Sequence, residues 1–210
     1  MVLMKVKKFH LNYKRKRFVL LLFTFILLIA IYFFKSSSFF LRATSTIAIM
    51  ILFYAADHFF NIRFRRRHYV FMFAIVILSF LTSQFYYTYP NYDKVQHFIQ
   101  PMLVCSLIFY MINRLHLQLK WKLVFTFFGV VAILGLFEIG EFALDLLFDL
   151  KLQGVYLRDT AGFEKFNLAM DPLRDTMIDI LLGVIGAALY SIVFGIVMKK
   201  KLNDTLFSEF

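Results

Sequence analysis

The sequence predicts an all-α fold: a polytopic membrane helical bundle of about six transmembrane helices, with both termini in the cytoplasm. Of the 210 residues, 61% are hydrophobic and 20% are aromatic, whereas a soluble domain is nearer half apolar. Several apolar runs are long enough to cross a hydrocarbon layer about 30 Å thick. Because backbone groups in lipid must bond within their own segment, these runs favour a helical bundle over a barrel.

The expected spans are separated by short polar or charged connections. We see no internal repeat and no soluble domain, so residues 1–210 are expected to form one integral membrane domain. The first span follows a basic stretch that resembles the start of a signal peptide, but no small-x-small cleavage site follows, and a retained anchor is expected. The expected spans cover residues 18–34, 43–60, 69–89, 95–113, 121–148 and 173–198.

The basic residues predict the orientation in the membrane. The formal net charge is +11, and the Lys and Arg residues lie between the apolar runs. Seven precede the first span, four follow the second, three follow the fourth and three follow the sixth, whereas the opposite side carries seven in all. Because cytoplasmic loops are enriched in Lys and Arg, the loop over about 149–172 is predicted to face outward. We expect membrane lipids as partners and no nucleic acid, since the charge lines no single groove.

Ionisable residues inside the apolar runs are the main functional signal, because a charge at the bilayer centre costs about 2.5–3.5 kcal/mol on insertion scales. Glu138, Glu141 and Asp145 follow one another at spacings of three and four, so they share one face of the fifth expected helix. Asp175 and Asp179 share a face of the sixth. The predicted topology places both groups in the outer half of the membrane.

A third polar pair begins the fourth expected span, where Asp93 and His97 are four residues apart. The predicted topology brings this pair to the same leaflet, so we expect one interior polar site shared by three helices. Two structural alternatives stay open, with Asp93 as an N-cap of its helix and Asp145 as a solvated residue at the rim. Asp171 precedes Pro172 and is expected to cap the sixth helix.

Other polar and small residues are explained by structure alone. Asp57 and His58 lie at the cytoplasmic end of the second span, where interfacial solvation or pairing with the neighbouring arginines accounts for them. Gly183 and Gly186 indicate close packing of the sixth helix. The single Cys105 excludes an intrachain disulfide and a Cys-rich metal site.

Three stretches in this order, "NYDKVQHFIQP", "FEIGEF" and "RDTMIDILLGVIGA", resemble the YjdF-like bacterial inner-membrane family and, more distantly, VanZ-like proteins. The resemblance covers about residues 84–195. It departs from the family at Phe142, where Trp is common, and at Pro101, near a position that is often Gly. The residues that match the family pattern are Asp93, Lys94, His97, Glu138, Glu141, Asp175, Thr176, Asp179, Gly186 and Ala187.

The resemblance implies a multi-pass protein of the bacterial inner (plasma) membrane with one polar centre in the outer leaflet. It implies no particular reaction. VanZ-like members are associated with glycopeptide (teicoplanin) resistance, which points to chemistry of the cell envelope.

The residue types in the centre suit a divalent metal ion, since carboxylate oxygens and one imidazole are ligands of Mg²⁺, Mn²⁺ or Zn²⁺. In a catalytic role, His97 or Glu141 would act as a general base. Asp93 would orient His97, while Lys94 and Arg174 would hold an anionic headgroup, with Asp145 as a further supporting residue. The candidate metal ligands are His97, Glu138, Glu141, Asp175 and Asp179.

Three functions stay open. The first is a metal-dependent enzyme acting on a lipid or lipid-linked cell-envelope substrate, although no compact signature such as H-E-x-x-H or a P-loop is present. The second is a proton- or cation-coupled transporter, although the chain has no inverted repeat and its polar cluster is biased to one leaflet. The third is a non-catalytic membrane protein whose polar or metal site is structural. The oligomeric state is left open.

Overall fold

The computed structural model describes residues 37–148, 151–158 and 166–207, together with residues 19, 22, 26 and 29. Apart from those four helical positions, the first expected span lies outside the described residues. The chain divides into two compact units, Met1–Leu81 and Thr82–Phe210, which we describe separately.

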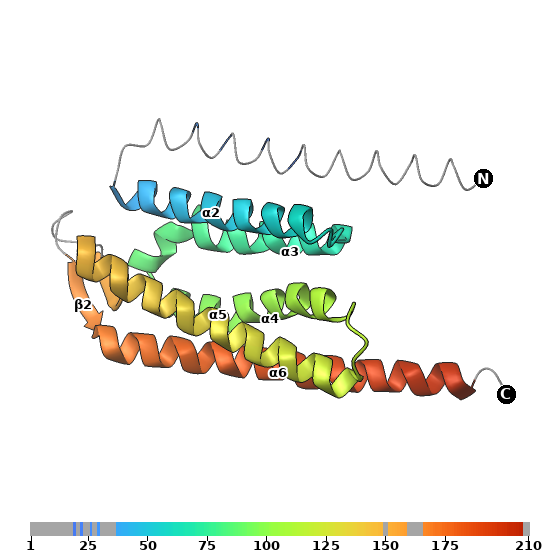
Figure 1. The fold of residues 1–210 in the computed structure, drawn as a ribbon. Helices are drawn as coiled ribbons and strands as arrows, with labels where there is room; N and C mark the ends of the chain where they lie inside the picture. The colour runs from blue at the N-terminus through green and yellow to red at the C-terminus, as the bar shows by residue number, and fades with distance from the viewer. Residues whose placement is uncertain are drawn as a thin grey trace. The chain divides into compact units, whose positions relative to one another are not determined.

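The first unit contains α2 (Ser37–Phe59), α3 (Arg66–Val76) and a π-helical turn, η1 (Ile77–Leu81) (Figure 1). Helix α2 ends before Asn61, whose φ of 48° lies in the left-handed region that Asn tolerates better than most residues. The Asn61 N–H still bonds to the carbonyl of His58, which closes the last turn. The helix therefore ends by a local backbone reversal.

One of the two expected spans in this part of the chain takes a different form from the prediction. The expected span 43–60 is helical as far as Phe59 and lies within α2. The expected span 69–89 is not one continuous α-helix, because α3 gives way to the π turn at Ile77 and then to a 3-10 helix, η2 (Ser83–Tyr87). Hydropathy alone does not distinguish these helix types.

The second unit contains η2, the helices α4 (Tyr92–Ile112), α5 (Leu119–Phe148) and α6 (Pro172–Phe207), and a short hairpin. Each of the three long helices contacts the other two (Figure 1). Among the described residues, α4, α5 and the Pro172–Lys201 part of α6 are long and apolar enough to cross a membrane. This supports a helical membrane protein, while the count of six spans stays a prediction.

Helix α6 packs closely on both neighbours through its small residues, as expected. A Cβ atom on Gly186 would collide with the backbone carbonyl oxygen of Phe98 in α4, and one on Gly183 would collide with the Leu134 side chain in α5. Between the helices, Cys105 and Ala187 are fully buried in the apolar core. Helix α6 thus lies directly against the α4 backbone at Phe98, the residue after His97, and polar side chains of the two helices are in contact near this point.

The start of α6 is capped as the sequence predicts. The Asp171 carboxylate accepts a 3.0 Å hydrogen bond from the Arg174 N–H, and Pro172 is the first helical residue. This satisfies one of the N–H groups that a helix start leaves without a partner. The first turn is therefore fixed, and with it the position of Asp175.

The expected outer loop holds an antiparallel hairpin, so the described chain is not purely helical. Strand β1 (Val155–Arg158) pairs with β2 (Phe166–Met170). Gly154 precedes β1 with a φ of 91°, and a Cβ atom there would lie 3.1 Å from the Met170 carbonyl oxygen. Only glycine meets both demands without strain. Strands of four and five residues carry too weak a periodic signal to be predicted beside three long apolar helices.

Candidate functional site

The first two turns of α4 supply three adjacent polar side chains. Asn91 occupies the N-cap position, so Asp93 lies inside the first turn and does not act as the cap. Asp93 Oδ1 is 3.5 Å from His97 Nε2, as expected for residues four apart on a helix. Asp93 Oδ2 is 3.2 Å from Lys94 Nζ. The carboxylate therefore faces the other helices and not the start of its own.

Lys94 lies at the centre of the acidic groups, whereas the sequence suggested that it would hold an anionic headgroup. Its Nζ atom donates to both carboxylate oxygens of Asp179, at 2.7 and 2.8 Å, and also contacts Asp175. The Lys94 side chain is only 11% exposed, so the ammonium has exchanged most of its water for carboxylates. This ammonium therefore ties α4 to α6.

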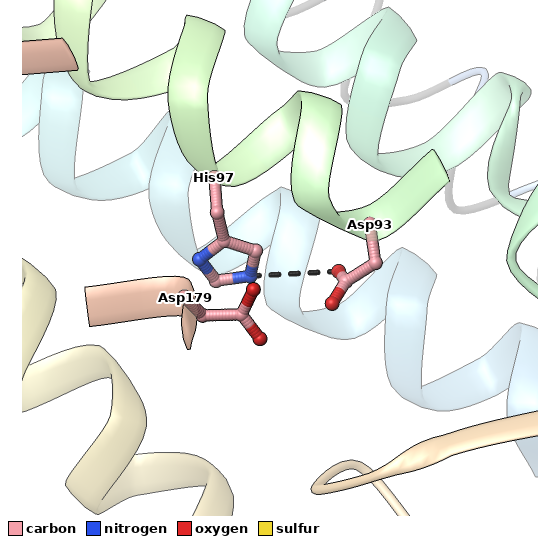
Figure 2. Close-up of side chains that lie close together, drawn as sticks. All are labelled: Asp93, His97 and Asp179. Atoms are coloured by element: carbon pink, nitrogen blue, oxygen red, sulfur yellow. Dashed lines mark ion pairs between the residues drawn. The ribbon is translucent and has the colours of Figure 1, made fainter. Parts of the chain in front are cut away.

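His97 lies between carboxylates from two helices. Its Nδ1 atom is 3.7 Å from Glu138 Oε1 on α5, while Nε2 faces Asp93. Figure 2 shows His97, Asp93 and Asp179 converging, two from α4 and one from α6. One donor atom from each of these three lies within 4.8 Å of the other two, and within the described ranges this is the group that fits a metal ion.

The segment before β1 is bonded to the start of α6. The Gly154 N–H donates to Asp175 Oδ2 at 2.8 Å, and Gln153 Nε2 donates to the Thr176 hydroxyl at 2.9 Å. Thr176 in turn hydrogen bonds to Glu138. Both carboxylate oxygens of Asp175 are thus occupied, one by Lys94 and one by the backbone. This makes Asp175 a poorer ligand candidate than Asp179.

Three expected site residues are not among the donor groups that converge. Glu141 is half-buried, and among the described residues no hydrogen bond or ion pair to it is seen. Asp145 accepts hydrogen bonds from the backbone N–H groups of Leu152 and Gln153, both at 2.7 Å. It therefore fixes the segment before β1 and is not simply a solvated residue at the rim. Arg174 is exposed at the start of α6. Asp145 therefore has a structural task.

A family model described as a predicted membrane protein, DUF2238, matches residues 16–200. The chain belongs to this family. The match confirms the membrane-protein family that the sequence motifs indicated, whose function is not established, and it does not extend to VanZ-like proteins. Neither the curated proteins nor the solved structures gave a match.

The polar centre of this DUF2238 protein holds more acidic than basic groups. Four carboxyl groups lie around one ammonium and one imidazole. The side chains of Glu138, Asp175 and Asp179 are at most 6% exposed. Even with the imidazole charged, fully ionised carboxylates would leave an excess of negative charge. Because such an excess is costly in a membrane, protons or a bound cation must balance it.

Some contacts of the centre could not be predicted from the sequence. Gln153 and Gly154 reach α6 from the segment before β1, and neither belongs to a motif. The sequence shows a charged Lys94 beside Asp93, but it does not predict which residues the Lys94 ammonium contacts. A lysine has a flexible four-carbon stem, so its position along a helix does not say where its ammonium lies.

Proposed function

We propose that this DUF2238 protein binds a divalent metal ion at Asp93, His97 and Asp179, and uses it in a reaction on a lipid or lipid-linked cell-envelope substrate. The convergence of these three donors within 4.8 Å carries the proposal. Two carboxylates and one imidazole form a donor set suited to Zn²⁺ or Mn²⁺, and to Mg²⁺ if water completes the shell.

The excess of carboxyl groups supports a cation at this place. Lys94 is the one ammonium within the described centre, and it contacts three of the four carboxylates. A second cation beside His97 would balance the remaining charge near Glu138. In a low-dielectric surrounding this balance matters more than in water. The donor geometry and the charge balance therefore favour the same position.

The neighbouring residues have distinct tasks in this proposal. Glu138 Oε1 is 3.7 Å from His97 Nδ1, so its negative charge favours a proton on that nitrogen and leaves Nε2 to the ion. A bound divalent ion supplies Lewis acidity toward a phosphoryl or carbonyl oxygen, or a more acidic water. Glu141, one turn beyond Glu138, is the candidate general base because no hydrogen bond or ion pair in the described chain occupies it.

The depth of the centre supports a lipid substrate. Asp93 and Asp179 are the second and eighth residues of their helices. At about 1.5 Å per residue they lie within roughly 10 Å of one end of the bundle, near the level of headgroups. Exposed apolar side chains on α5, such as Ile139 and Leu146, offer a surface for acyl chains. A water-soluble substrate would not need that surface.

Metal analysis of the purified protein tests the proposal. We expect about one divalent ion per chain after loading with Mn²⁺ or Zn²⁺ and removal of excess, and loss of that ion in Asp179→Asn. Asp171→Asn is the matched control, because it makes the same chemical change at the start of α6 and Asn remains a good N-cap. Turnover of a polar lipid extract, followed by mass spectrometry, should stop on chelation.

Two results would count against this function. Folded wild-type protein that retains no Mn²⁺ or Zn²⁺ after loading would exclude the metal centre. Equal retention by wild type and Asp179→Asn would place the ion elsewhere in the chain.

A second candidate is a non-catalytic membrane protein in which the centre is a network of ion pairs that only holds the helices together. The contacts of Lys94 with Asp175 and Asp179 favour it, because they join α4 to α6 without any ion. Under this reading, metal loading leaves the midpoint of thermal unfolding unchanged. Under the metal proposal, it raises that midpoint, since a ligand that binds only the folded state stabilises it.

A further inference from the structure

The connection between α2 and α3, together with the first turn of α3, carries a cluster of exposed arginines. Ile62 and Phe64 are each 2% exposed, and they alternate with arginines that face outward. We call residues 59–67 the arginine loop. Its exposed arginines are Arg63, Arg65, Arg66 and Arg67.

A buried carboxylate fixes the arginine loop. Asp57 is 1% exposed, so solvation, one of the two explanations that the sequence left open, does not account for it. Its Oδ1 accepts the Phe64 N–H at 3.1 Å and its Oδ2 accepts the Tyr69 hydroxyl at 2.9 Å. The Phe64 ring stacks on Phe53 with the ring centroids 4.6 Å apart. The backbone that carries the arginines is thus held at its centre.

Two arginines are oriented by side-chain bonds. Arg63 Nε donates to Asn61 Oδ1 at 2.9 Å, and Arg67 Nε donates to His68 Nε2 at 3.3 Å. Arg63 has a φ of 55°, a conformation that an arginine adopts only when its surroundings impose it. The first turn of α3 contains no acidic residue, so nothing there offsets the partial positive charge of the helix start.

An apolar surface adjoins these charges. Phe59 is 79% exposed and Phe60 is 72% exposed, where α2 passes into the arginine loop. Two neighbouring phenylalanines in contact with solvent are unfavourable, whereas at a membrane surface they lie among acyl chains. A partner that carries both an anion and a hydrocarbon chain matches both features.

We propose that the arginine loop is a binding site for the phosphate headgroup of an anionic phospholipid. Guanidinium groups hold phosphate oxygens in pairs of parallel hydrogen bonds, which gives geometric selectivity as well as attraction. Phe59 and Phe60 then contact the acyl chains of the same lipid. This site is independent of the metal centre in the second unit.

A built site differs from diffuse attraction between a basic loop and an acidic membrane, which depends on net charge alone. Asp57→Asn makes the region more positive by one charge, so diffuse attraction predicts tighter binding. A built site predicts weaker binding, because the amide no longer holds the loop as the carboxylate does. Tyr69→Phe removes the hydroxyl bond to Asp57 without changing charge, and only a built site predicts an effect.

The test uses the full chain in detergent, titrated with short-chain dioctanoyl phosphatidylglycerol and followed by native mass spectrometry. We expect one lipid to bind about tenfold more tightly than dioctanoyl phosphatidylcholine. Arg63→Lys/Arg67→Lys keeps the charge but removes the guanidinium groups that can donate two parallel hydrogen bonds. It should weaken binding of phosphatidylglycerol about tenfold. The control Lys199→Gln/Lys200→Gln removes two exposed charges and should leave binding unchanged.

Other outcomes overturn the proposal. Equal affinity for the two lipids removes the anion site. Unchanged affinity in Arg63→Lys/Arg67→Lys, with tighter binding in Asp57→Asn, leaves only diffuse attraction. Inorganic phosphate that displaces the lipid at equal concentration shows a free-phosphate site without a lipid contribution. If thermal unfolding shows that Asp57→Asn does not fold, Tyr69→Phe decides between a built site and diffuse attraction.

Discussion

At the scale of single residues, Lys94 is a cation that the chain itself supplies to its acidic centre. Its ammonium engages Asp93 and both oxygens of Asp179, which are two of the three donors proposed for the metal ion. An ammonium and a divalent ion cannot both take the same oxygens at full strength. Binding of one must therefore weaken binding of the other, and the coupling is reciprocal.

Lys94→Gln should therefore increase metal affinity. We expect Mn²⁺ to bind about tenfold more tightly once the competing ammonium is gone, measured by isothermal titration of the detergent-purified protein. Lys151→Gln serves as the control, because it removes an exposed charge outside the centre. If Lys94→Gln binds Mn²⁺ no better and unfolds at a lower temperature than wild type, Lys94 is a structural tie and the competition is excluded.

Residue spacing predicts some members of the centre and not others. The four-residue spacings of Asp93 with His97 and of Asp175 with Asp179 are enough to assign each pair to one helical face. Spacing does not predict which oxygens are already occupied, which is why Asp175 looked as good a ligand as Asp179. Its second partner, Gly154, comes from a segment 21 residues away in sequence, and contacts at such separations leave no periodic pattern.

At the scale of elements, the site depends on how closely α6 lies against α4. Gly186 lets α6 rest on the backbone of Phe98, and His97 is the residue before Phe98. A side chain at this position would have to push backbone atoms apart, since the carbonyl of Phe98 cannot rotate away as a side chain can. If the two helices moved apart, the distances from Lys94 to the carboxylates of α6 would increase.

Gly186→Ala is expected to lower the free energy of unfolding by about 1–3 kcal/mol through overpacking. It should also weaken metal binding. Thermal unfolding in detergent and metal titration measure the two effects. Gly140→Ala is the matched control, since a Cβ atom there meets nothing within 4 Å and Ala is the better helix former. A Gly186→Ala variant as stable as Gly140→Ala would contradict the packing argument.

The three long helices were predictable because each is a continuous apolar run, and hydropathy sums over many residues. The hairpin and the change from α3 to the π turn were not, because they depend on local hydrogen bonds among few residues. The hairpin also needs anchors that come from elsewhere, namely Asp145 and Asp175. The acidic residues that looked functional in the sequence thus include two that accept hydrogen bonds from the backbone of this segment.

At the scale of the whole molecule, the charge distribution predicts how the chain lies across the membrane. The acidic centre is near the start of α6, whereas Lys199, Lys200 and Lys201 lie in its last turns. Together with the basic residues before the first span and in the arginine loop, these predict that the basic ends lie in the cytoplasm and the centre near the outer surface. Under this predicted orientation, a substrate of the centre would come from the outer leaflet, and the lipid proposed for the arginine loop from the inner leaflet.

Cysteine labelling of intact cells tests this orientation directly. Cys105 is the only cysteine in the sequence, so Cys105→Ala gives a background without thiols. A membrane-impermeant maleimide should label Lys151→Cys in intact cells, but Arg66→Cys and Lys200→Cys only after lysis. Labelling of Lys151→Cys and Lys200→Cys from the same side would mean that α6 does not cross the membrane. Labelling of all three in the reversed order would place the acidic centre in the inner leaflet, and an outer-leaflet substrate would then be excluded.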